Sequence, residues 1–111
     1  MIMHVLVRKS PYCDPGPPAC AVFLDREEAA AIAEDPWEAA GWCTTADFFV
    51  QSVKIIGIYT PGKPVFAAHQ AMDSGEGYRF ISLYSTFEAA EVAAGNLGAV
   101  IELFPDYRPQ Y

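Results

Sequence analysis

Few side chains in this sequence are suited to catalysis or metal binding. They are two histidines and three cysteines: His4, His69, Cys13, Cys20 and Cys43. An imidazole can act as a general base near neutral pH, but both histidines fall in strand-like runs, where a structural role is more common. The five residues could supply four zinc ligands, yet the cysteines lack the paired CxxC spacing of structural zinc sites. We therefore predict no catalytic residue, no metal site and no cofactor.

The three cysteines also bear on redox chemistry. An odd number fits a reducing compartment better than a disulfide framework, although Cys13 and Cys20 flank a proline-rich loop and could pair across it. Cys43, beside Trp42, is the best candidate for a reactive thiol, but the acidic residues around it disfavour the thiolate. We expect Cys43 to be inert, and the pairing of Cys13 with Cys20 stays open.

The sequence carries no recognisable motif for binding phosphate or activating a nucleophile. The GxGxxG, P-loop, HExxH and nucleophile-elbow patterns are absent. Residues 73–77 read DSGEG and resemble a phosphate-binding turn, but Asp73 and Glu76 would repel phosphate. We expect an ordinary connection between strands there, and a protein that is not an enzyme.

The formal charge of −7 is concentrated in one stretch of the chain. Residues 25–47 hold seven acidic side chains and one arginine, a net charge of −6, which leaves −1 for all other residues. Direct binding to nucleic acid normally needs clustered Lys and Arg, so this distribution argues against it. A locally acidic surface favours a basic protein partner, including one that itself binds nucleic acid.

The second half of this acidic stretch brings both tryptophans among its carboxylates. Aromatic anchors ringed by charge are typical of protein-binding surfaces, although one or both tryptophans could instead close the end of the core. The loop at residues 11–14 adds an aromatic and an acidic side chain. The predicted partner-binding residues are Glu34, Asp35, Trp37, Glu38, Trp42, Asp47, Tyr12 and Asp14.

The elements that must position these residues are predicted from apolar periodicity and turn signals. Strands are expected at residues 2–8, 19–24, 48–60, 65–72, 78–84 and 99–104. The run 48–60 is apolar on both faces, which predicts a central strand, and Pro61-Gly62 predicts a hairpin that leads into 65–72. Two helices are expected after the caps Asp25 and Ser85, and a short extra helix near 36–40.

The two main helices belong to a possible internal repeat. Residues 20–33 align with residues 80–93 at a spacing of sixty, and each copy reads as a strand, a cap, a Glu three positions later and an Ala-rich helix. Four of the fourteen aligned positions are identical, and three of those are alanines. Duplication and chance similarity both stay open, while the shared local structure predicts the element order ββαβ followed by ββαβ.

This order predicts an α+β protein built as a two-layer sandwich. We expect a single, mainly antiparallel sheet of about six strands, with both capped helices on one face. A single domain would span residues 1–104, in halves of about 1–60 and 61–104, followed by a tail at 105–111. No apolar run reaches the roughly 18 residues of a membrane span, and the first one is too short for a signal peptide, so a soluble, cytoplasmic protein is expected.

Three functions are compatible with these features. The favoured one is a non-enzymatic, acidic protein-binding module that inhibits a basic or nucleic-acid-binding partner; phages and mobile elements carry inhibitors of this type, anti-CRISPR proteins among them. The alternative is a small-molecule-binding or enzymatic domain, with a pocket between sheet and helices or at a dimer interface, lined by Tyr12, His69, Tyr78 and Tyr84. The third is a structural module that forms a homodimer through an edge strand.

Overall fold

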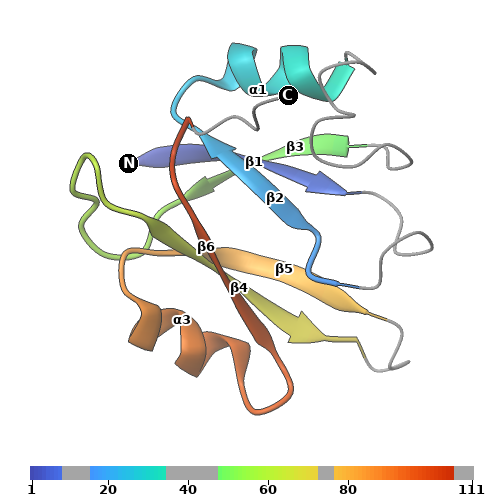
Figure 1. Ribbon diagram of the computed structural model, residues 1–111, viewed down its shortest axis with the longest axis vertical. Coiled ribbons are helices and arrows are strands. Elements are labelled where there is room, and N and C mark those ends of the chain that lie inside the picture. Colours follow the sequence, from blue (N-terminus) through green and yellow to red (C-terminus); the bar gives the residue numbers. More distant parts are fainter. Residues whose placement is uncertain (9–15, 35–47, 73–76, 107–111) are drawn as a thin grey trace.

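The strands and helices occur in the predicted order. The computed structural model describes residues 1–8, 16–34, 48–72 and 77–106. The first half contains β1 (Ile2–Arg8), β2 (Ala19–Phe23), α1 (Arg26–Glu34) and β3 (Phe48–Lys54). The second half contains β4 (Val65–Ala71), β5 (Tyr78–Tyr84), α3 (Phe87–Ala94) and β6 (Ala99–Leu103). The described part of the chain is thus an α+β fold of six strands and two helices, as the sequence predicts (Figure 1).

The strands form two sheets, so the prediction of a single six-stranded sheet is wrong. One three-stranded sheet has the order β2-β1-β3 and the other has the order β5-β4-β6, with antiparallel pairing throughout. In each half the first strand is central, and the helix connects the two outer strands. The predicted hairpin between 48–60 and 65–72 is also wrong, because β3 and β4 lie in different sheets.

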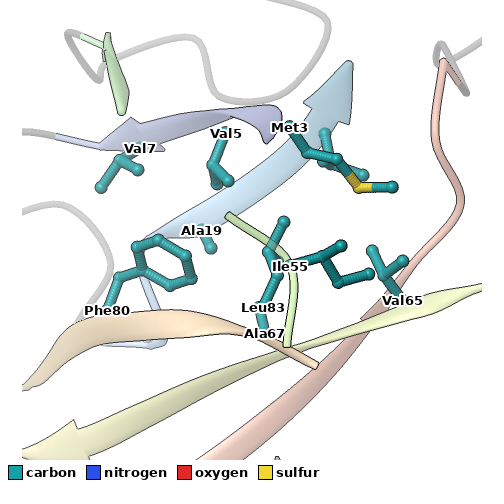
Figure 2. Packing of buried hydrophobic residues seen from close by; sticks show 10 residues of the cluster. Met3, Val5, Val7, Ala19, Ile55, Val65, Ala67, Phe80 and Leu83 are labelled. Atoms are coloured by element: carbon teal, nitrogen blue, oxygen red, sulfur yellow. The ribbon is translucent and has the colours of Figure 1, made fainter. Parts of the chain in front are cut away.

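The two sheets pack face to face, and the helices cover their outer sides (Figure 1). Between the sheets lies the largest apolar cluster, in which Met3, Val5 and Val7 of β1 face Ala67 and other residues of the second sheet (Figure 2). The helices therefore lie on opposite sides of the molecule rather than on one face. Counted from α1 to α3, the arrangement is helix, sheet, sheet, helix.

Alternation along the strands explains how each sheet is buried on both faces. In β1, Leu6 points away from the central cluster and packs with Phe23, Ala29 and Ile32 beneath α1. Beneath α3 the buried members of the corresponding cluster are the small side chains Ala68, Ala90 and Ala94, and larger, partly buried side chains such as Phe66 and Tyr84 pack against them. Because both faces of the sheets are covered, nearly continuous apolar strands are expected.

The helix caps show that equivalent positions around the two helices are 61 residues apart. Asp25 Oδ1 accepts from the Glu27 N–H at 2.9 Å, and Thr86 Oγ1 accepts from the Ala89 N–H at 3.3 Å. Thr86, rather than the predicted Ser85, is therefore the N-cap of α3. A one-residue shift exchanges the two faces of a strand, so the sixty-residue alignment pairs inward residues with outward ones.

The run 48–60 does not form one long central strand. β3, an edge strand of its sheet, ends at Lys54, and the chain then crosses to the other sheet. There the Ile56 N–H donates to Leu83 O, and the Ser85 N–H donates to Ile56 O. Gly57 follows with φ of 103°, a conformation that L residues rarely adopt.

The end of the second half makes the reciprocal crossing. After β6 the Asp106 N–H donates to Val22 O, and Asp106 Oδ1 accepts from the Leu24 N–H. Each half thus extends from its third strand to the second strand of the other half. The two crossings join the sheets at β5 and at β2.

Some sequence-based expectations lie outside the described residues. They are the extra helix near 36–40, the pairing of Cys13 with Cys20, the inert Cys43 and most of the tail at 105–111. Within the described ranges, neither helix is long and apolar enough to cross a membrane.

Candidate functional site

The outward face of α1 carries Glu27 and Glu34, two of the four described acidic residues of the acidic stretch; Asp25 precedes the helix and Glu28 is half-buried. Ala29 and Ile32 are buried against the sheet, while Glu27, Ala31 and Glu34 are exposed along the opposite side. Their spacing of four and three residues places them in one stripe along the helix. Asp25 and Arg26 are exposed at the start of the helix, so this face has a net negative charge.

One of the eight predicted partner-binding residues lies in the described part of the structure. Glu34 is the exposed last residue of α1. The other seven lie outside the described residues, in segments 9–15 and 35–47. Segment 9–15 starts after Arg8 and segment 35–47 ends before Phe48, and these two described residues are register partners in neighbouring strands.

Near this end of the sheets lies a buried histidine that sequence reasoning considered only as a base or a pocket residue. His69, on β4, is fully buried, and its Nε2 accepts from the Ala19 N–H of β2 at 3.2 Å. Its ring also packs against Phe80, with centroids 5.6 Å apart. His69 therefore connects the two sheets across the central cluster.

The surroundings of His69 keep its ring neutral. Burial lowers its pKa from 6.5 to about 4; the carbonyls of Ala99 and Ala67 partly oppose this shift, and the positive charge of Arg8 adds to it. Its Nδ1 makes no hydrogen bond of ordinary geometry within the described residues. A neutral ring with Nε2 as acceptor suits a structural role, because a buried general base would need access to a substrate proton.

Arg8 also holds the segment that leads into β2, through hydrogen bonds to its backbone carbonyls. This residue is also buried, and its Nη2 donates to Gly16 O at 2.8 Å and to Pro17 O at 3.0 Å. Its backbone N–H donates to Pro18 O. Arg8 and His69 together fix residues 16–19, where two prolines lack the N–H groups that a strand would use. The sequence signal for Arg8 was a charge at the end of an apolar strand.

The remaining described candidates lie in different parts of the fold. Tyr84 packs in the cluster beneath α3, whereas His69 reaches into the space between the sheets. His4 is hydrogen-bonded to Ser52 across β1 and β3, with 2.8 Å between Nδ1 and Oγ. Cys20 Sγ donates to Pro18 O. Two hollows on the surface lie elsewhere, at the ends of α3, and neither is lined by His69, Tyr78 or Tyr84.

Within the described ranges, no group of three or more His, Cys, Asp or Glu side chains could hold a metal ion. Comparison with known proteins gives no further guidance, since no family model, curated protein or solved structure matches this chain. The chemistry of the protein's surfaces is therefore the basis for the function proposed below.

Proposed function

We propose that the protein binds another protein through the outward face of α1 together with the acidic segment 34–47 that follows it in sequence. The observation that carries this proposal is the outward stripe of Glu27 and Glu34 on α1. It continues in sequence into a segment that holds three more acidic residues and both tryptophans. Carboxylates attract a basic partner over long range, and tryptophans are among the residues that contribute most to binding energy in protein interfaces.

The proposed partner has a basic surface of the kind that contacts nucleic acid. Carboxylates held on one face can take the place of phosphates in such a groove. Occupation of the groove would block the partner's own ligand, so the protein would act as an inhibitor. Neither step needs a catalytic residue or a cofactor.

Affinity capture from a lysate of the source cells, followed by binding measurements with the purified partner, tests this function. Raising the salt concentration from about 0.1 M to about 1 M shortens the Debye length from about 10 Å to about 3 Å. We expect the affinity to fall by more than about tenfold over this range. Binding that does not respond to salt would contradict a charge-driven complex.

Charge reversal locates the surface. The triple variant Glu34→Lys, Asp35→Lys and Glu38→Lys is expected to lose the partner, and Glu34→Lys alone is expected to weaken it. Glu102→Lys is the matched control, because Glu102 is an exposed acid on β6, outside the acidic stretch. Retention of the partner by the triple variant would exclude residues 34–38 from the interface.

A further inference from the structure

Exposed apolar side chains gather around α3. Among the described residues, the three most exposed large apolar side chains are Ile58 at 87%, Val92 at 84% and Leu97 at 80%. Val92 lies on α3, Leu97 follows its C-terminus, and Ile58 lines a hollow beside its N-terminus. Other exposed apolar side chains, such as Ile2 and Phe49, lie in the first half, but the most exposed ones lie beside α3. Exposed apolar surface of this kind can mark an interaction site.

The hollow at the N-terminal end of α3 is apolar with one positive charge. It measures about 260 Å³ and is lined by Ile58, Tyr59, Thr60, Lys63, Pro64, Phe66 and Ser85. Phe87 packs edge-on against Phe66, with ring centroids 6.0 Å apart, and is itself half-exposed. Lys63 supplies the charge, and the positive end of the helix dipole adds to it.

The hollow at the C-terminal end has the opposite polarity. It measures about 510 Å³ and is lined by Glu91, Val92, Gly95, Asn96 and Gly98. The helix has no basic residue in its last turn, so the negative end of its dipole and Glu91 act together. Val92 stands beside this acidic end as an exposed apolar side chain.

Between the two ends, a small side chain on the outward side of α3 would let another helix approach closely. The helix has eight residues and is about 12 Å long. Ala89, near its middle, is exposed and small, and small side chains allow two helices to pack closely. Glu88, in the first turn, is also exposed, and its negative charge would repel an acidic group that approaches this side of the helix.

We propose that this surface binds a second copy of the chain, with the two α3 helices antiparallel across a two-fold axis. In a two-fold interface each surface meets itself in reverse. The Lys63 end of one copy then faces the Glu91 end of the other, and Val92 of one copy enters the apolar hollow beside Ile58 of the other. The charge pair and the apolar contact each form twice, once on either side of the axis.

This dimer is independent of the proposed function, because α1 lies on the opposite outer side of the molecule (Figure 1). Both acidic faces stay accessible in the dimer. The protein would then present two copies of its acidic surface, pointing away from each other. A partner with two or more basic sites would be held more tightly than one face alone could hold it.

The molecular mass in solution, measured by sedimentation equilibrium, tests the dimer. We expect a dimer for the natural sequence and a monomer for Val92→Asp. The matched control is Ala31→Asp, which places the same charge at the equivalent exposed position of α1 and is expected to stay dimeric. Circular dichroism of each variant verifies that it is folded. A monomeric natural protein, or a dimer that Val92→Asp leaves intact, would overturn the proposal.

A charge exchange tests the antiparallel arrangement. Lys63→Glu and Glu91→Lys each bring like charges together in the dimer, and each is expected to weaken dimerisation by about tenfold or more. An equimolar mixture of the two variants restores opposite charges at both ends, so it is expected to form a heterodimer. Failure of the mixture to dimerise better than either variant alone would exclude this arrangement.

Discussion

The two helices occupy equivalent places in the two halves, yet their outer surfaces differ in kind. Along α1 the outward stripe reads Glu27, Ala31 and Glu34, and the equivalent positions of the second half are Glu88, Val92 and Gly95. The buried sides of the two helices are more alike, since the equivalent residues Ala29 and Ala90 are both fully buried alanines. The fold constrains the buried side of each helix, and the outer side is free to serve binding.

The layers beneath the helices differ in a second way. Under α1 the cluster contains large side chains such as Phe23 and Ile32, whereas under α3 its fully buried members are alanines. Since burial of large apolar groups provides most of the stabilisation of a fold, α1 is expected to depend more strongly than α3 on its packing against the sheet.

The largest predicted effect tests this difference directly. Phe23→Ala removes a fully buried ring beneath α1 and is expected to lower the free energy of unfolding by about 3–5 kcal/mol. Tyr84→Ala at the equivalent, half-buried position beneath α3 should cost about half as much. Urea denaturation followed by circular dichroism measures both. Equal losses would show that the two layers contribute alike.

The next effect concerns the central strands, where His69 and Val7 occupy equivalent buried positions directly after a register shift. The pKa of His69 is lowered to about 4 in the folded protein, so the unfolded chain binds a proton first as the pH falls. His69 therefore contributes stability above pH 6.5 that is lost as the pH falls through 4, by on the order of 3 kcal/mol.

Two substitutions separate the pH response from the hydrogen bond of His69. His69→Val copies the other half and should remove this part of the pH dependence, but it leaves the Ala19 N–H without its acceptor, at a cost of about 1–3 kcal/mol at neutral pH. His69→Gln keeps an acceptor and also does not titrate. Unfolding midpoints between pH 7 and pH 4 measure the response, and the same slope in both variants as in the natural protein would assign it to other groups.

The smallest effect compares the two crossings between the sheets. A Cβ on Gly57 would collide with Ser85 Oγ, and the φ of 103° adds strain, so Gly57→Ala should cost about 1–3 kcal/mol. Asp106→Ala removes the acceptor of the Leu24 N–H and should cost about 1 kcal/mol. Gly62→Ala is the control for strain alone, because open space surrounds that position. Thermal unfolding ranks the three variants.

The sequence predicts the elements better than their assembly. The apolar, β-prone runs at residues 2–8 and 78–84 predict the bounds of β1 and β5 as observed, and Asp25 is a cap as expected. Periodicity shows which residues of a strand are buried but not which strands pair, so the division into two sheets could not be derived from it. The isoleucines of residues 55–58 make this segment look like a continuation of the strand. In the structure Ile55 and Ile56 lie in the crossing between the sheets, and Ile58 lines a hollow on the surface.

The candidate site shows the same limit. The acidic stretch is visible in the composition, and the structure places its described helix on an outer face, with Glu34 exposed. The pairing of His69 with the Ala19 N–H was beyond prediction, because it joins residues fifty positions apart in different sheets. The choice of Ser85 over Thr86 as a cap failed for a simpler reason, since both hydroxyls can accept the same hydrogen bond.

The reciprocal crossings have a consequence for how the chain can be divided. Each half carries the residues that complete the other: Ile56 pairs beside β5, and Asp106 pairs beside β2. A break between Pro61 and Gly62, where the chain is exposed, would leave two fragments with complementary ends. Each fragment would keep its own three-stranded sheet but would lose the crossing hydrogen bonds and the other sheet that covers its inner face. We therefore expect the two fragments to fold by associating with each other, as one interlocked pair.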